Sequence, residues 1–255
     1  MLNQRNYSQF TRTEILIGKE AIKILEKKRV AVIGLGGVGS YAVEALARAG
    51  VGRFLLIDFD KINLSNLNRQ LIALHETVDK SKTEVMLNRI LSINPQAEVT
   101  TITEFLAQEN RDQYLHEVDY LIDAIDSLGP KIGLIQHCIE HEIPVISVMG
   151  AGNRLDPTQI HISKLSKSWN CPLAKRVRKF LRRRGVTVDI PVVFSSETAV
   201  QPEHEEDEES DEIIMHRGRK RLTIGSLSYM PAIMGMMAAS YVIRDILKLI
   251  KNLSD

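Results

Sequence analysis

A glycine-rich turn between a buried strand and a helix constrains the fold of this chain more than any other feature. Residues 30–33 are apolar and read as a buried strand, and residues 38–49 after the turn read as a helix. Gly34, Gly36 and Gly39 have the spacing of the dinucleotide-binding fingerprint. The first glycine permits a tight turn, the second lets backbone approach a phosphate or ribose, and the third lets the helix pack close to the strand. The helix N-terminus offers free N–H groups to an anion, so the turn predicts a nucleotide site.

A carboxylate stands where this fingerprint needs one. Asp58 ends a second apolar strand, about 20 residues beyond the turn, at the position of the ribose-binding acid. Its two oxygens can accept hydrogen bonds from both ribose hydroxyls. The pattern therefore indicates an adenine nucleotide but does not separate NAD from ATP.

The polar residues that follow favour ATP over NAD. A triphosphate needs cations that neutralise its β- and γ-phosphates as pyrophosphate leaves, and a dehydrogenase has no such need. Arg69 and Lys82 could supply these charges. Lys82 stands in the first turn of an expected helix, where a cation is unfavourable unless an anion lies nearby. The complete polar set is Asp60, Asn66, Asn68, Arg69, Gln70 and Lys82.

Several segments together resemble the ATP site of the E1-like adenylating enzymes, which include the ubiquitin-activating enzymes and the thiamine and molybdopterin adenylyltransferases. The segments are Gly34-Leu-Gly-Gly-Val-Gly39, Asp58-Phe-Asp60, Asn66-Leu-Asn-Arg-Gln70, Lys82 and Asp123-Ala-Ile-Asp-Ser127. Further motifs are similar to one branch, the tRNA threonylcarbamoyladenosine dehydratases. These are Leu46-Ala-Arg-Ala-Gly-Val-Gly52, Ile93-Asn-Pro95, Gly150-Ala-Gly152 and Asp156-Pro-Thr158.

The resemblance implies a set of site residues. Asp126 would hold Mg²⁺ against the phosphates, although Asp123 or Asp126 could instead cap the next helix with Ser127. The implied catalytic residues are Arg12, Arg69, Lys82 and Asp126. The implied ATP-binding residues are Gly34, Gly36, Gly37, Gly39, Asp58, Asp60, Ser65, Asn66, Asn68, Arg69, Gln70, Lys82, Asp126 and Ser127.

Arg12 is the one implied residue outside the nucleotide-binding half. In the family, an arginine of an N-terminal Arg-x-x-Arg-like segment reaches the triphosphate of the neighbouring subunit, which implies a homodimer. Gln9 replaces the first arginine here, so only Arg12 carries over. The alternative is an ordinary surface arginine in the first turn of a helix.

The implied chemistry is activation of a carboxylate as an acyl-adenylate. In the dehydratase branch the carboxylate belongs to N6-threonylcarbamoyladenosine in the tRNA anticodon loop. An internal group then closes a ring and AMP leaves. The main alternative is an adenylyltransferase acting on the C-terminal glycine of a ubiquitin-like sulfur carrier, whose bacterial members mostly carry Cys-x-x-Cys pairs that are absent here. A sulfur-transfer protein is a possible partner, and Cys171 could be a nucleophile that forms a thioester. A non-catalytic nucleotide-binding scaffold and a dehydrogenase are further alternative functions.

The length suits one large domain, or one domain with an appendage, and the resemblance implies a single E1-like adenylation domain. The 255 residues, 44% of them hydrophobic, suffice for a doubly wound, Rossmann-like, mostly parallel α/β sheet with a mixed-strand C-terminal extension and a C-terminal apolar helix. We divide it into an N-terminal helical segment (1–28), a nucleotide half (29–152) and a substrate and dimerisation half (153–255) with a flexible acidic loop (200–222). Two cysteines without zinc or disulfide spacing and a polar N-terminus indicate a cytoplasmic protein.

The remaining elements follow from periodicity. We expect strands at 98–103, 118–123, 144–149, 160–162 and 186–194, and helices at 11–27, 79–93, 107–116, 130–142 and 171–184. A capping box of Thr11 and Glu14 would start the first helix. Residues 227–250 form an apolar helix broken by Pro231, which we interpret as a buried or dimer-packing helix rather than a membrane span.

Charge is distributed unevenly in the second half. The helix 171–184 could present a solvated face or a surface that tracks the phosphates of tRNA. The block 203–212 is acidic and should be disordered, and 216–221 is again basic. The candidate tRNA contacts are Lys175, Arg176, Arg178, Lys179, Arg182 and Arg183.

One short motif matches a metal site by sequence but is more typical of an ordinary helix. His137-Cys-Ile-Glu-His141 matches an inverted zinc-protease motif. It lies in a crossover helix between two buried strands, and the sequence shows no third ligand. We therefore interpret both histidines as surface residues.

Overall fold

The computed structural model describes residues 8–200 and 224–249. Within them a seven-stranded sheet has the order β3-β2-β1-β4-β5-β7-β6 and is parallel except for β6, which pairs antiparallel with β7. The strands are β1 (Arg29–Ile33), β2 (Arg53–Ile57), β3 (Glu98–Ile102), β4 (Tyr120–Asp123), β5 (Val145–Val148), β6 (Ile160–Lys164) and β7 (Pro191–Ser195). The expected doubly wound fold with a mixed extension is confirmed.

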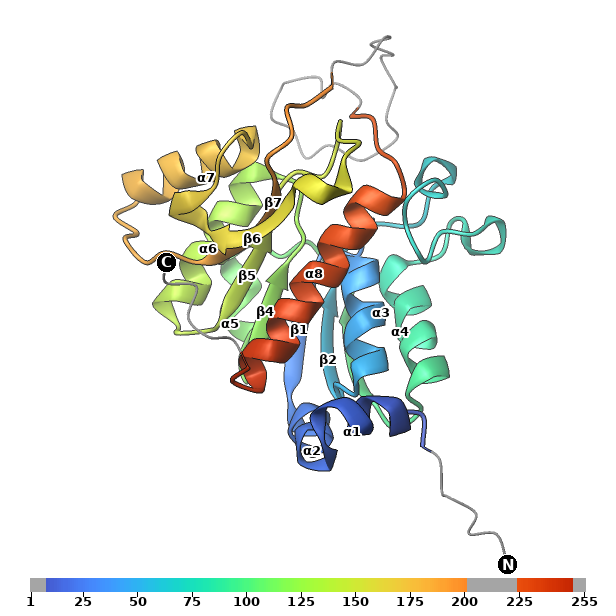
Figure 1. The fold of residues 1–255 in the computed structure, drawn as a ribbon. Helices are drawn as coiled ribbons and strands as arrows, with labels where there is room; N and C mark the ends of the chain where they lie inside the picture. The colour runs from blue at the N-terminus through green and yellow to red at the C-terminus, as the bar shows by residue number, and fades with distance from the viewer. Residues whose placement is uncertain (1–7, 201–223, 250–255) are drawn as a thin grey trace, which may run out of the picture.

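Helices cover both faces of the sheet (Figure 1). Those of one face are α3 (Gly39–Ala49), α4 (Lys82–Ile93) and α8 (Tyr229–Ile246), and those of the other are α5 (Arg111–Tyr114), α6 (Leu128–Glu140) and α7 (Pro172–Arg183). Strand residues alternate between the two cores: Val30 and Val32 of β1 join the first, Ala31 and Ile33 the second. This alternation is the two-residue period of a strand buried on both sides.

The first expected helix is two helices. Gly18, with φ +87°, separates α1 (Thr11–Ile17) from α2 (Lys19–Lys27). The prediction of a capping box was wrong. Phe10 occupies the N-cap position, and the Thr11 hydroxyl accepts a hydrogen bond from the Ser8 N–H at 2.8 Å. Because α1 turns away from the sheet, its apolar residues Ile15 and Leu16 are 81% and 84% exposed.

Two other expectations need correction. The last strand begins only at Pro191, so residues 186–190 precede β7. Pro231 does not break α8, because it lies in the first helical turn, where an N–H has no intrahelical partner. The expected acidic loop at 203–212 and basic cluster at 216–221 lie outside the described residues.

The C-terminal helix α8 packs against the start of α3, beside the glycine-rich turn. A Cβ on Gly235 would lie 2.2 Å from the Val38 carbonyl oxygen, so only glycine permits this approach. Pro231 also lies 3.2 Å from where a Cβ of Gly37 would be. The expectation of a buried helix is therefore confirmed. Among the described residues, no helix has the length and apolar character needed to cross a membrane.

Candidate active site

The glycine-rich turn lies at the carboxyl edge of the sheet, where β1 has β2 on one side and β4 on the other. Crossovers leave β1 in opposite directions, and ligands of open α/β sheets bind at such a point. Gly34 has φ +89°, and a Cβ there would lie 2.9 Å from the Ala124 carbonyl oxygen. A Cβ on Gly39 would lie 1.8 Å from the Gly34 carbonyl oxygen. Both glycines are thus required by close backbone contacts.

Asp58 is fixed at the end of β2 by two backbone N–H groups. Its Oδ2 accepts from Leu35 at 2.6 Å and its Oδ1 from Asp60 at 2.9 Å. Burial raises the pKa of the Asp58 carboxyl, although the Lys82 charge and the two N–H groups act in the opposite direction. The carboxylate is therefore held in one orientation beside the turn, where it could meet a ribose.

Lys82 lies close to Asp58 but pairs with Asp60. Its Nζ is 2.7 Å from Asp60 Oδ2, and the residue is only 5% exposed. The anion that the sequence required near this lysine is therefore present within the chain. The ammonium group is held at the carboxyl edge, on the first residue of α4.

The segment after β2 places polar groups beside the turn. Arg69 Nη1 donates to the Ser65 carbonyl and to Asn68 Oδ1, both at 2.9 Å. Asn66 is buried, and its Oδ1 accepts from the Asn63 N–H at 3.1 Å, so it shapes the loop. Asn68 donates to the Ser226 carbonyl at 3.1 Å and ties this loop to the segment before α8.

Gln70 and Gly36 face each other across this edge. A Cβ on Gly36 would lie 3.8 Å from Gln70 Nε2 and would meet nothing closer. Gln70 Oε1 is buried and has no hydrogen-bond partner among the described residues. A buried amide oxygen without a partner is costly, and a bound hydroxyl or amino group would satisfy it.

Asp126 completes the edge from β4. It is exposed, and its Oδ1 accepts from the Ser127 hydroxyl at 3.0 Å. Asp123 is fully buried, with its Oδ1 accepting from the Ile125 N–H at 3.1 Å. Neither carboxylate is the N-cap of α6, a position that Ser127 occupies. Asp126 is therefore the carboxylate that remains accessible to a cation.

Arg12 is not brought to this edge. It is exposed on α1, which lies with α2 at the amino ends of the strands, far from the 61–78 loop (Figure 1). Gln9 donates to Asn94 Oδ1 at 3.3 Å and fixes this end of α1. Within one chain, the structure assembles the expected residues without Arg12.

Comparison with known proteins identifies the family of this chain. The model of the ThiF family matches residues 10–254. The chain belongs to the ThiF family. The tRNA threonylcarbamoyladenosine dehydratase of Bacillus subtilis is 41% identical over 243 residues, covering 94% of this chain and 95% of the relative. That of Escherichia coli is 41% identical over 203 residues, 76% of each chain. The crystal structure of the E. coli enzyme in complex with ATP matches with a TM-score of 0.84 and 35% identity over 94% of both chains.

One buried charged residue near this edge was not found from the sequence. Lys131 is fully buried, and its Nζ donates to Asp123 Oδ2 at 2.7 Å, Val148 O at 2.9 Å and Ser147 Oγ at 3.2 Å. Ser147 also donates to Asp123 Oδ2 at 2.6 Å. The network joins β4, β5 and α6 beneath Asp126. A lysine inside an otherwise apolar stretch of a crossover helix was the available signal.

The basic helix α7 is only partly available to a ligand. Arg178 Nη1 donates to the Leu165 and Ser168 carbonyls at 3.0 and 2.9 Å, so this arginine anchors the helix instead of facing solvent. Arg178 is half-buried, and its role as a tRNA contact stays a prediction. The remaining candidates are exposed: Lys175, Arg176, Lys179, Arg182 and Arg183.

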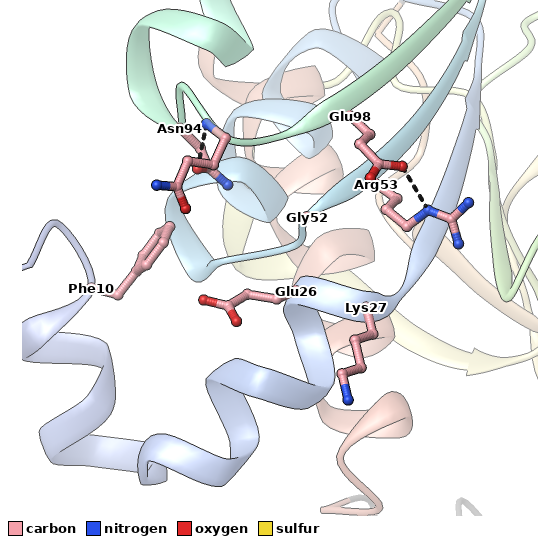
Figure 2. A pocket seen from close by; sticks show the side chains of 8 residues that line it. Phe10, Glu26, Lys27, Gly52, Arg53, Asn94 and Glu98 are labelled. Carbon is pink, nitrogen blue, oxygen red and sulfur yellow. Dashed lines mark hydrogen bonds and ion pairs between the residues drawn. The ribbon is translucent and has the colours of Figure 1, made fainter.

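A cavity of about 420 Å³ lies elsewhere, between α2 and the amino ends of β2 and β3 (Figure 2). Its lining includes Phe10, Glu26 and Asn94, and an Arg53–Glu98 ion pair of 3.1 Å closes one side. None of the expected ATP-binding residues lines it. The cavity is therefore separate from the carboxyl-edge site.

Replacing Lys131 by Met should destabilise the chain strongly. The variant keeps the apolar volume but leaves the buried Asp123 carboxylate without its cation, at a cost of about 3–5 kcal/mol in unfolding free energy. Urea denaturation followed by circular dichroism measures this. The exposed Lys80→Met variant is the control and should change little. Equal stabilities for the two variants would contradict a structural role for the buried pair.

Proposed function

We propose that this chain catalyses the ATP-dependent dehydration of N6-threonylcarbamoyladenosine in tRNA, giving the cyclic form with AMP and pyrophosphate. One observation carries the proposal: relatives named for this activity match nearly all of both chains. The carboxyl edge of this chain also holds Asp58, Arg69 and Lys82, which the proposed reaction would use.

The substrate carboxylate attacks the α-phosphorus of ATP, and pyrophosphate leaves. An internal group of the same modified nucleoside then attacks the activated carbonyl, and AMP leaves. Arg69, Lys82 and the N-terminus of α3 would offset phosphate charge while Asp58 holds the ribose. No protein nucleophile is required. Both cysteines are buried, and burial raises the pKa of the Cys138 thiol to about 12, which removes a reactive thiolate.

The residues present fit ATP. Gly36 leaves open space beside the turn, and the unpartnered Gln70 oxygen lies next to it. The ribose acid is already oriented by two N–H groups. These are the features of a site that is preorganised for a nucleotide.

We propose that Asp126 holds Mg²⁺ together with the phosphates. Its carboxylate is exposed at the same edge, and hard cations take carboxylate and phosphate oxygens together. A single protein carboxylate suits Mg²⁺, which keeps several waters and uses substrate phosphates for the rest of its coordination. The ion would supply neutralisation of phosphate charge.

The alternative, activation of a sulfur carrier, is not favoured by any contact in the described residues. The two cysteines lie at positions 138 and 171 and form no Cys-x-x-Cys pair. The exposed cations of α7 instead suit a nucleic acid, since phosphates attract clustered lysine and arginine. We therefore propose that tRNA contacts the outer face of α7.

A second copy of this chain would explain the exposed apolar residues of α1. The helix exposes Ile15 and Leu16 beside Arg12, and neighbouring apolar side chains on one exposed face suit contact with another protein surface. We propose a homodimer in which Arg12 reaches the ATP site of the partner. The position of Arg12, far from the site of its own chain, is consistent with that role.

Arg69→Ala should lower the dehydration rate about 100- to 1000-fold, as expected for loss of a charge that stabilises a transition state. The assay incubates tRNA carrying threonylcarbamoyladenosine with ATP and Mg²⁺ and weighs the nucleosides by mass spectrometry. The product is lighter by one water. Arg53→Ala, at the opposite edge, is the control. An unchanged nucleoside from wild-type protein that binds ATP would refute the function.

The same assay over a Mg²⁺ series tests Asp126. Asp126→Asn should raise the Mg²⁺ concentration needed for half-maximal rate, because the amide cannot supply the negative charge. An unchanged Mg²⁺ dependence would exclude Asp126 as a ligand.

Lys175→Ala combined with Lys179→Ala should weaken tRNA binding and flatten its salt dependence. The loss of two phosphate contacts lowers the slope of log affinity against log salt by roughly 1.5–2. Filter binding at several salt concentrations measures the slope. The pair Lys19→Ala and Lys27→Ala removes equal charge from α2 and serves as control. Identical slopes for the two double variants would remove α7 from the tRNA surface.

Mixing Arg12→Ala with Arg69→Ala protein should restore part of the activity that each variant lacks alone. If Arg12 acts on the partner's site, a mixed dimer contains one complete site. Mixing Arg69→Ala with Lys82→Ala is the control and should restore nothing, because both residues serve the same chain's site. A first mixture as inactive as its components would contradict action across the dimer.

A further inference from the structure

Three metal-binding side chains converge between α5 and α6, away from the carboxyl-edge site. Asp112 Oδ1 lies 3.4 Å from His141 Nε2 and 3.7 Å from His137 Nδ1. The three ligand atoms all lie within 4.8 Å of one another. Asp112 supplies the third ligand that the sequence did not reveal. His137 is 8% exposed, so its interpretation as a surface residue was wrong, whereas His141 is exposed as expected.

We propose that Asp112, His137 and His141 form a binding site for Zn²⁺ or a similar divalent transition metal. Two imidazoles and one carboxylate are ligands that Zn²⁺ accepts, with a fourth position left for water. The proposal concerns a site outside the ATP-binding edge and does not depend on the proposed function.

Helix geometry presets the two histidines. They stand four residues apart on α6 and its C-cap, and their rings stack with centroids 4.1 Å apart. His141 Nδ1 lies 2.9 Å from the His137 carbonyl oxygen, which only an N–H on Nδ1 can satisfy. A neutral ring then has its lone pair on Nε2, the atom that faces Asp112. A hydrogen bond from the other ring nitrogen to a carbonyl commonly fixes the orientation of a metal-binding histidine.

The lone pair of His141 Nε2 therefore points at a carboxylate oxygen, an arrangement that a cation would make favourable. Zn–N and Zn–O bonds of about 2.0–2.2 Å separate tetrahedral ligand atoms by roughly 3.3 Å. The two contacts of Asp112 need only small side-chain rotations to reach that value. Because Asp112 is largely exposed, its side chain can make this adjustment.

The end of α6 adds to the attraction for a cation. A helix C-terminus carries about half a negative charge, which stabilises positive charge within its last turn. Arg111 acts against the metal, since its side chain lies over Gly133 of the same helix. The site is thus suited to reversible binding and would fasten α5 to α6.

The proposed metal is remote from the reaction. Ser127 begins α6 and His141 follows its end, a separation on the order of 20 Å at 1.5 Å per residue. Glu140, the residue that would act as base in a protease, instead accepts from Gln136 Nε2 at 2.7 Å. The site is therefore assigned a structural role and no hydrolytic one.

The test titrates the chelator-treated full chain with Zn²⁺ by isothermal titration calorimetry, without nucleotide or tRNA. We expect one site per chain and a raised Tm, and Co²⁺ in place of Zn²⁺ should give the visible absorption of a tetrahedral site. His141→Ala and Asp112→Asn should each weaken Zn²⁺ binding at least tenfold, since each removes one proposed ligand. Both residues are exposed, so their replacement leaves the core intact.

His75→Ala and Asp79→Asn are the matched controls. Each removes an exposed metal-binding side chain at another place, and both variants should bind Zn²⁺ like wild type. Binding that survives both His141→Ala and Asp112→Asn, or the absence of Zn²⁺ binding to the wild-type chain, would overturn the proposal. Loss of dehydratase activity by other variants would leave this result unaffected, so the two proposals fail separately.

Discussion

The backbone of Gly34 lies against that of Ala124, and the carboxyl edge depends on this contact. It brings the turn after β1 next to the loop after β4, while Gly39 draws α3 onto the same turn. Because no side chain intervenes, the N-terminus of α3 and the carboxylate of Asp126 can face one ligand. Gly235 extends the arrangement by letting α8 pack on α3. Elements from both halves of the chain therefore shape one edge.

The charged groups of this edge are costly to bury, and their arrangement suits binding of a nucleotide. Asp58 carries a raised pKa in a buried position, and Lys82 is nearly inaccessible. Each has polar partners within the chain, so the edge is already oriented before a ligand binds. Lys131 and Asp123 likewise are buried and pair with each other within the chain. Such preorganisation lowers the cost of ordering groups around a nucleotide.

Features set by local sequence were predictable. The turn at Gly34, the strand ending on Asp58 and the loop bearing Arg69 follow from spacing and hydrophobic pattern, which report on neighbours along the chain. The structure places them at one edge as expected. The basic helix at 171–184 was also found, because its charges are consecutive. These signals are strong because each is contained in a short segment.

Features set by tertiary contacts were not predictable. Arg178 reads as one more cation of a basic helix, yet the carbonyls of Leu165 and Ser168 bind it. Asp112 lies 25 positions before His137 in the sequence, and only the packing of α5 on α6 brings them together. Gly18 divides the first helix where periodicity suggested continuity. Arg178 and Asp112 depend on contacts with residues that are distant in the sequence, and Gly18 acts through its backbone conformation.

The proposed reaction begins when the substrate carboxylate attacks the α-phosphorus of ATP at this edge. Labelling both oxygens of the threonylcarbamoyl carboxylate with ¹⁸O tests this step, because the attacking oxygen remains on phosphorus when AMP departs. We expect AMP that carries one ¹⁸O atom per cyclised nucleoside, measured by mass spectrometry of the reaction mixture. Unlabelled AMP, or ADP with the label in inorganic phosphate, would contradict it.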